Sequence, residues 1–219
     1  MSSQRALHTL LDTKIIAIVR SPSSTELVQV ARALLDGGIR AIEVTLTVPR
    51  AAKVLEQIAE ELGQEIVLGA GTVLDAETAR LAILAGAEFI VAPNTNAAVI
   101  RVCRRYSRLA IPGAFTPTEV VRAWELGADI VKVFPAEIGG PAYIRALKAP
   151  LPQVRLMPTG GVNLQTAADF LKAGACCLGI GAQLVEPRAI AERNFSRITE
   201  LAQQYVALVR QHSATASGS

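Results

Sequence analysis

Short apolar runs rich in Val, Ile, Leu and Ala alternate along the chain with longer amphipathic stretches. This alternation is typical of repeated strand and helix units, whose strands form a parallel sheet. The pattern predicts eight strands, at residues 14–20, 41–46, 65–70, 88–93, 108–113, 129–134, 154–159 and 176–181.

The stretches between these strands have helical periodicity, and several of them end in glycine. Leu27, Val30, Leu34 and Leu35 fall on one face of a predicted helix, and a glycine pair follows it. Glycine in these places stands where the helix must stop before the next strand begins. Similar helix ends recur at residues 84–87, 125–128 and 172–175.

Eight such units in 219 residues predict an α/β protein, a single (β/α)8 TIM barrel over residues 14–210. Residues 1–13 predict an additional N-terminal helix, and the small polar residues 211–219 predict a disordered tail. The competing architecture is a doubly wound open sheet. That fold more often carries a glycine-rich fingerprint after its first strand, whereas Ser-Pro-Ser-Ser-Thr follows Arg20 here.

Composition narrows the class of protein. Hydrophobic residues make up 51% and charged residues 19%, as expected for a compact chain with a large core. The net charge is only +3, and no basic run with interleaved aromatic residues is present. Nucleic acid is therefore not a predicted partner.

The cysteines and the N-terminus indicate a cytoplasmic protein. Cys103, Cys176 and Cys177 have no disulfide-framework spacing, and the adjacent pair could close only a strained ring, so we expect reduced thiols. The N-terminus lacks the apolar core of a signal peptide, and no apolar run reaches the ~18 residues of a membrane span. We expect no membrane partner.

Two charged residues interrupt predicted strands. Lys132 lies in the apolar run at 129–134, and Glu43 lies in the run at 41–46, where Thr45 and Thr47 share its side-chain period. A buried ion pair between Lys132 and Glu43 is one interpretation, although such a pair adds little net stability after desolvation. The alternative is a catalytic site, because catalytic residues of barrels gather at strand ends.

A lysine buried in an apolar strand is suited to Schiff-base chemistry. The nucleophile is the neutral amine, and burial together with a nearby cation such as Arg20 would lower the lysine pKa from its ordinary value of about 10.4. Both histidines, His8 and His212, lie outside the predicted strands, so Glu43 is the candidate proton shuttle. No residue cluster has the spacing of metal ligands, and we predict no metal site.

Glycine turns follow the seventh and eighth predicted strands. Gly160 and Gly161 follow the seventh strand, and Gly179 and Gly181 lie at the end of the eighth. Many barrels bind phosphate at these two positions through backbone N–H groups. A tight left-handed turn is the alternative explanation of such glycines.

From about Ile15 to Leu184 the chain resembles the 2-keto-3-deoxy-6-phosphogluconate (KDPG) aldolases, and six sequence blocks carry the resemblance. This family includes enzymes that also act on 4-hydroxy-2-oxoglutarate. The resemblance implies a class I aldolase, usually a homotrimer, that cleaves KDPG to pyruvate and glyceraldehyde 3-phosphate. The blocks are IEVTLTVP (42–49), GAGTV (69–73), PGAFTPTE (112–119), VKVFPAE (131–137), PTGGVN (158–163) and GIGAQLV (179–185).

The resemblance also assigns roles to individual residues. Lys132 corresponds to the Schiff-base lysine and Glu43 to the general acid/base, which works through a water molecule. No external cofactor is needed, because the protonated imine is itself the electron sink. The implied substrate-binding residues are Arg20, Thr47, Thr72, Pro93, Phe134 and Thr159, and the implied phosphate-binding residues are Gly160, Gly161, Gly181 and Ala182.

Two positions depart from the family pattern. One branch has arginine where this chain has Thr47, so Arg20 would supply the positive charge, and many members have serine in place of Ala182. The PTGG and EVTL blocks favour a gluconate over a galactonate substrate. Two other readings stay open: a sugar-phosphate isomerase or epimerase in which Lys132 is only a charge, and a non-catalytic protein that binds phosphorylated metabolites.

Overall fold

The computed structural model describes residues 3–216 and contains all eight predicted strands, most of them shorter at the ends. The predicted fifth strand is divided at Pro112, which has no N–H to donate to a strand ladder. The strands are β1 (Ile15–Val19), β2 (Ala41–Thr45), β3 (Val67–Gly71), β4 (Phe89–Val91), β5 (Leu109–Ile111), β6 (Gly113–Ala114), β7 (Val131–Val133), β8 (Leu156–Pro158) and β9 (Leu178–Ile180).

Helix α1 precedes the first strand, and a helix follows almost every strand, as the sequence predicts. The helices are α1 (Ser3–Thr13), α2 (Leu27–Asp36), α3 (Ala51–Leu62), α4 (Ala76–Leu84), α5 (Ala97–Arg105), α6 (Pro117–Glu125), the 3₁₀ helix η1 (Ala136–Ile138), α7 (Gly140–Lys148), α8 (Ala167–Lys172), α9 (Pro187–Ala191) and α10 (Phe195–Ala216). No helix within residues 3–216 is long and apolar enough to cross a membrane.

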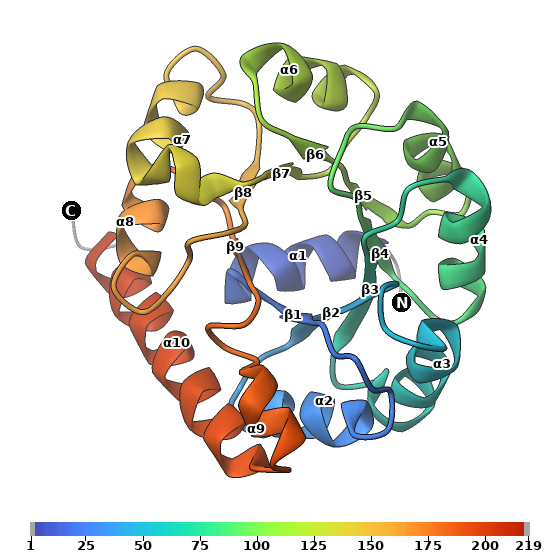
Figure 1. Cartoon of the computed structure of the whole chain (residues 1–219). Helices are drawn as coiled ribbons and strands as arrows, with labels where there is room; N and C mark the ends of the chain where they lie inside the picture. Colours follow the sequence, from blue (N-terminus) through green and yellow to red (C-terminus); the bar gives the residue numbers. More distant parts are fainter. Residues whose placement is uncertain (1–2, 217–219) are drawn as a thin grey trace.

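The strands pair in parallel in two sheets. One sheet has six strands in the order β5-β4-β3-β2-β1-β9, and the other has three in the order β6-β7-β8. The six-stranded sheet curves as a half-barrel, and the helices that follow the strands lie outside it (Figure 1). The predicted α/β class with parallel strands is confirmed.

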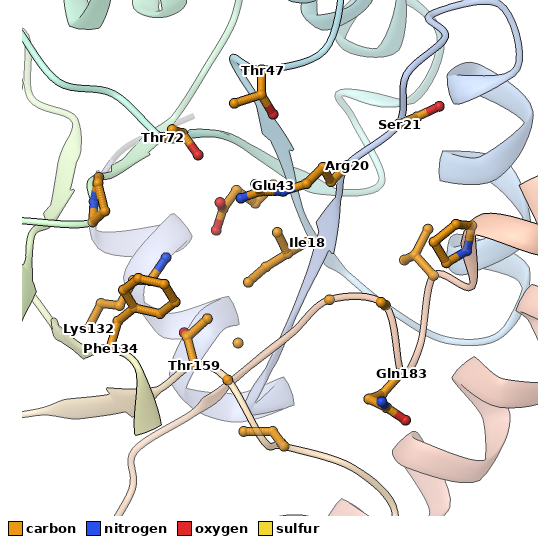
Figure 2. Close-up of a pocket in the computed structure, with 18 of the residues that line it drawn as sticks. Ile18, Arg20, Ser21, Glu43, Thr47, Thr72, Lys132, Phe134, Thr159 and Gln183 are labelled. Carbon is orange, nitrogen blue, oxygen red and sulfur yellow. The ribbon is translucent and has the colours of Figure 1, made fainter. Parts of the chain in front are cut away.

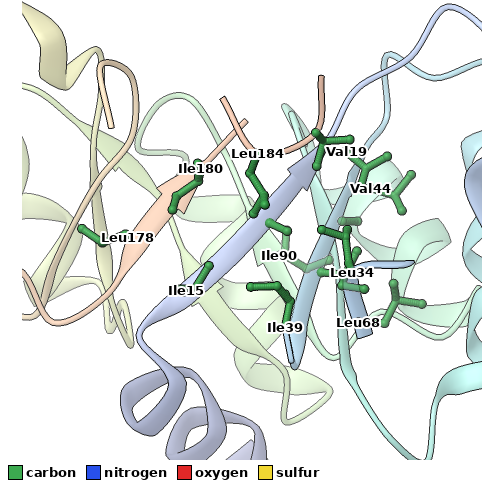
Figure 3. Packing of buried hydrophobic residues seen from close by; sticks show 14 of the residues in the cluster. Ile15, Val19, Leu34, Ile39, Val44, Leu68, Ile90, Leu178, Ile180 and Leu184 are labelled. Carbon is green, nitrogen blue, oxygen red and sulfur yellow. The ribbon is translucent and has the colours of Figure 1, made fainter. Parts of the chain in front are cut away.

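Apolar side chains form two separate cores. The larger core lies between the strands and the outer helices, where Ile15 and Val19 of β1 pack with Val44 of β2 and Leu34 of α2 (Figure 3). Because every β1 residue is buried, the strand reads as a continuous apolar run.

The smaller core joins the predicted N-terminal helix, α1, to the inner face of the strands. Ala6 and Leu10 of α1 pack in one cluster with Ala41, Val67 and Leu109. These three residues are the first residues of β2, β3 and β5. The helix therefore covers the N-terminal ends of the strands, and Figure 1 shows it in the middle of the ring of strands.

The prediction that glycine ends the helices is confirmed at four positions. Gly38, Gly86, Gly127 and Gly174 all have φ between +93° and +103°. This left-handed conformation is costly for other residues and reverses the chain toward the next strand.

The prediction of a disordered tail from residue 211 is wrong for residues 211–216. Helix α10 continues from Phe195 to Ala216, because no glycine or proline interrupts the chain between Arg210 and Gly218. Residues 217–219 of the predicted tail, and residues 1–2 of the predicted N-terminal helix, lie outside the described residues.

Candidate active site

All twelve residues predicted to form the site line one cavity of about 910 Å³. Its walls come from the segments at the C-terminal ends of β1–β4 and β7–β9. This is the end opposite α1, where catalytic residues of such folds lie. The predicted residues in its lining are Arg20, Glu43, Thr47, Thr72, Pro93, Lys132, Phe134, Thr159, Gly160, Gly161, Gly181 and Ala182.

Lys132 is fixed in the middle of β7. It pairs in register with Gly113 of β6 and Met157 of β8, and its backbone N–H donates to the Pro112 carbonyl at 2.9 Å. Its residue exposure is only 8%, and its Nζ lies 4.9 Å from the centroid of the Phe134 ring. The amine therefore ends in a largely apolar setting at the cavity wall.

Glu43 lies on β2, and its exposure is 1%. Figure 2 shows its carboxylate and the Lys132 amine directed into the same space. Within the described part of the chain, Glu43 Oε2 has no hydrogen-bond partner. A buried carboxylate oxygen without a protein partner is the arrangement expected of a group that acts on a ligand or a solvent molecule.

Burial moves both groups toward their neutral forms. Burial raises the pKa of Glu43, and the positive charges of Lys132 and Arg20 oppose this rise. Burial lowers the pKa of Lys132, with Arg20 acting in the same direction and Glu43 opposing it. No salt bridge joins the described Glu43 and Lys132 side chains, although the charge of each acts on the other.

Arg20 follows β1 and lies beside Glu43 in Figure 2. It is exposed at the mouth of the cavity, and its charge acts on both Glu43 and Lys132. Thr47, which stands where one family branch has arginine, shares a 2.9 Å hydrogen bond with the hydroxyl of the buried Thr45. Among the described residues that line the cavity, Arg20 and Lys132 are therefore the two with cationic side chains.

Thr72 and Pro93 follow β3 and β4 at the cavity wall. Thr72 has φ +59°, which is strained for a β-branched residue. Such strain persists only where the surrounding structure enforces it, and it is frequent at functional sites.

Thr159 continues β8 and bridges in parallel to Gly179 of β9. It is buried, and its Oγ1 has no partner among the described residues. A Cβ on Gly179 would lie 2.3 Å from this oxygen, so a larger residue there would displace the hydroxyl. The free hydroxyl is positioned to bind a group in the cavity.

The glycine turns occupy the side of the cavity near β8 and β9. Gly160 and Gly161 have φ of +95° and +70°, whereas Gly181 has open space where a Cβ would be. The Glu137 carboxylate lies against Gly160. If Gly160 had a Cβ, that atom would be 1.8 Å from Glu137 Oε2. A negative charge thus stands beside the turn that the sequence assigned to phosphate.

Sequence reasoning missed seven residues of the cavity lining as site residues. Most of them lie in the loops after β1, β8 and β9. A search of every residue after these strands would have included them, because loops at strand ends form such sites. Ile18 lies inside β1, and that search would have missed it. The seven are Ile18, Ser21, Pro22, Val162, Gln183, Val185 and Pro187.

Within residues 3–216, no group of three or more His, Cys, Asp or Glu side chains is placed to hold a metal ion.

Comparison with known proteins gives consistent results. The chain is 39% identical over 197 residues to 2-dehydro-3-deoxy-phosphogluconate aldolase of Treponema pallidum, covering 90% of this chain and 93% of that protein. It is 34% identical over 199 residues to 2-dehydro-3-deoxy-6-phosphogalactonate aldolase of Escherichia coli, covering 90% of this chain and 94% of that protein.

A solved structure is similar throughout the chain. The KDPG aldolase of Legionella pneumophila, with pyruvate captured at low pH as a covalent carbinolamine, superposes with a TM-score of 0.83 at 30% identity. The match covers 90% of this chain and 96% of that chain. The family model described as KDPG and KHG aldolase matches residues 7–201. The chain belongs to the KDPG and KHG aldolase family.

Proposed function

We propose that this protein is a class I aldolase that cleaves KDPG to pyruvate and glyceraldehyde 3-phosphate, with Lys132 as the Schiff-base lysine. The observation that carries the proposal is the pairing of Lys132 and Glu43 in one cavity, both buried and both with their pKa values moved toward the neutral form. The covalent pyruvate adduct of the similar Legionella pneumophila enzyme supports it.

The reaction begins at the substrate ketone. The neutral Lys132 amine attacks C2 to form a carbinolamine, which loses water to give an iminium. Glu43, acting through a water molecule, moves the protons of these steps and takes the proton of the C4 hydroxyl. The C3–C4 bond then breaks, the aldehyde leaves, and the bonding electrons become the π bond of an enamine.

The second half releases the three-carbon product. The enamine carbon takes a proton and regenerates the iminium, and water adds to C2. Expulsion of the Lys132 amine gives pyruvate and the free enzyme. Glu43 cycles between carboxylate and carboxylic acid, for which its raised pKa is suited.

The remaining residues bind the substrate. We assign the anionic carboxylate end to Arg20 and Thr72, the sugar hydroxyl groups to Thr47 and Thr159, and the apolar walls to Pro93 and Phe134. The phosphate is held by backbone N–H groups of the turns. These belong to Gly160, Gly161, Gly181 and Ala182.

The two sheets together make a closed (β/α)8 barrel in this proposal. Three observations support closure: β5 and β6 follow one another through Pro112, the Lys132 N–H bonds to Pro112, and Thr159 bridges in parallel to Gly179. The cavity would then be the mouth of the barrel.

Substrate stereochemistry gives a second candidate. The 34% identity to the galactonate aldolase favours testing the 2-keto-3-deoxy-6-phosphogalactonate isomer, which differs at a single substrate carbon. A third substrate to test is 4-hydroxy-2-oxoglutarate, which carries no phosphate. The sequence blocks favour the gluconate isomer, so we place it first.

The proposed assembly is a cytoplasmic homotrimer. Large apolar side chains are exposed on and beside α4 and α5, where a neighbouring copy would cover them. They are Leu74, Leu81, Leu84 and Tyr106. Light scattering on the purified protein tests the number of copies.

The decisive experiment is borohydride reduction of the protein in the presence of pyruvate, followed by intact and peptide mass spectrometry. One reduced pyruvate adduct per chain, located on Lys132, is the expected result. A folded protein without the adduct contradicts the proposal and favours an isomerase or a binding protein. Incubation with KDPG separates those two, because a binding protein leaves it intact.

A further inference from the structure

Two adjacent thiols lie away from the cavity and have no part in the aldolase chemistry. Cys176 and Cys177 lie in a bend just before β9, and their sulfur atoms share a hydrogen bond at 3.7 Å. The sequence predicted an extended strand here, in which neighbouring side chains point to opposite faces. The bend is what brings the two sulfur atoms together.

The two thiols have different surroundings. Cys176 is partly exposed, whereas Cys177 is fully buried in the core beneath α1. The hydrogen bond with Cys177 lowers the pKa of Cys176, burial opposes this, and the positive charges of Arg155 and Lys148 lower it further. The hydrogen bond with Cys176 and burial raise the pKa of Cys177. The thiolate therefore forms first on Cys176, the less buried of the two residues.

Both cations are held in place by the backbone. Arg155 donates to the Asp129 carbonyl at 2.7 Å, and Lys148 Nζ donates to the Val154 carbonyl at 2.8 Å. Their positive charge is thus a fixed part of the structure near Cys176. A thiol beside fixed cations with partial exposure is the setting of a reactive cysteine.

The third cysteine provides an internal comparison. Cys103 is fully buried on α5, and burial raises its pKa to about 12. A buried thiol in apolar surroundings is inert toward water-borne reagents.

We propose that the Cys176–Cys177 pair is a reversible oxidation site for small hydroperoxides, with Cys176 as the attacking thiol and Cys177 as the resolving thiol. Reactive cysteines next to a second thiol commonly follow this sequence. The site is independent of the aldolase activity, because it lies before β9, at the end of that strand remote from Gly181.

The chemistry takes two steps. The Cys176 thiolate attacks one peroxide oxygen, the O–O bond breaks, and the alkoxide or hydroxide that leaves takes a proton from solvent. Cys176 is now a sulfenic acid, oxidised by two electrons. The Cys177 sulfur attacks the Cys176 sulfur, the S–S bond forms, the S–O bond breaks, and the hydroxide leaves as water with the Cys177 proton.

The product is readily reversed. A disulfide between neighbouring residues closes a small strained ring, and strain makes a disulfide easier to reduce. A small thiol such as dithiothreitol should restore both cysteines.

The test is hydrogen peroxide treatment of the folded wild-type chain, followed by intact mass and peptide mapping without reduction. The expected result is the loss of two hydrogen atoms, located in the peptide that contains Cys176 and Cys177, while Cys103 stays a thiol. Dithiothreitol should reverse the change. Oxidation of Cys103 at the same rate as the pair, or a pair that stays reduced, overturns the proposal.

Two variants assign the roles of the thiols. Cys177→Ala should accumulate a sulfenic acid on Cys176 that a dimedone probe traps, and Cys176→Ser should slow the oxidation of residue 177 by roughly tenfold or more. Equal oxidation rates of wild type and Cys176→Ser contradict the assignment. Circular dichroism measures whether each variant is folded. If a variant is unfolded, the peptide map of the oxidised wild-type chain tests the proposal instead.

Discussion

The carboxylate of Glu43 occupies the space that a side chain on Gly71 would fill. A Cβ on Gly71 would lie 1.7 Å from Glu43 Oε1 and 2.5 Å from its Cδ. The two residues lie on neighbouring strands, β2 and β3, and the buried Glu43 lines the cavity. Gly71 does not have a positive φ, so the need for glycine here is steric and not conformational.

Gly71→Ala should therefore displace Glu43 without a backbone penalty. We expect kcat to fall by roughly 10–100-fold, because misplacing a catalytic group by about 1 Å costs that much. The pyruvate adduct on Lys132 should still form. Steady-state kinetics and borohydride trapping measure the two effects separately.

Gly38→Ala is the matched control. Gly38 has φ +93°, and the nearest atom to an added Cβ is 3.5 Å away on Val206, far from the cavity lining. This variant should lose stability, by about 1–2 kcal/mol, and keep its kcat. Equal losses of kcat in both glycine variants would show that Gly71 acts through general stability.

Lys132→Ala should abolish the pyruvate adduct and lower turnover by roughly a thousandfold or more, since the covalent pathway is removed. The variant should stay folded, because burial disfavours the charged amine that is removed. Lys53→Ala, which changes an exposed lysine on α3, is the control and should behave as wild type. Near-normal turnover in Lys132→Ala would refute the Schiff-base assignment.

Glu43→Gln keeps the shape of the side chain and removes its proton chemistry. We expect turnover to fall by roughly 10²–10⁴-fold, the usual contribution of a general acid or base. Pyruvate binding should weaken much less. An unchanged kcat, with adduct formation intact, would mean that another group moves the protons.

Arg20→Met tests the electrostatic control of Lys132. The Arg20 cation disfavours the ammonium form and lowers the pKa of Lys132, so its removal raises that pKa. Because the neutral amine is the nucleophile, the pH profile of pyruvate adduct formation should move to higher pH. A profile at the wild-type position, measured by rapid borohydride quenching, would show that Arg20 acts only on the substrate.

Glu137→Gln tests the negative charge beside the phosphate turn. Removal of the carboxylate next to Gly160 should lower KM for KDPG by about twofold to fivefold, a modest effect because Glu137 is exposed. KM for 4-hydroxy-2-oxoglutarate, which has no phosphate, should not change. If both values fall alike, the residue does not discriminate phosphate.

The repeated units of the fold could be predicted because each carries its own local signals. Strand runs such as Ile15–Val19 are continuously apolar, and glycines such as Gly86 mark the helix ends. The break at Pro112 has a local cause in the missing N–H of proline, and the predicted strand at 108–113 did not take it into account. The bend at Cys176 depends on how neighbouring strands pair, and a local pattern does not contain that information.

The site also contains some residues that local sequence signals reveal and others that only the folded structure reveals. Lys132 and Glu43 were identifiable because a charge inside an apolar strand is costly and needs a reason. Ser21 and Gln183 are ordinary loop residues, and only the folded chain brings them to the cavity. The role of Gly71 was also hidden, because its cause is the position of an atom on a different strand.

Helix α1 packs across the N-terminal ends of the strands, so that end of the fold is closed. The cavity lies at the opposite end, and the proposed substrate and both products would share that one mouth. In the proposed mechanism the aldehyde has to leave through it first, because the three-carbon part is still bonded to Lys132. In the direction of synthesis the order reverses, and pyruvate would have to enter before the aldehyde.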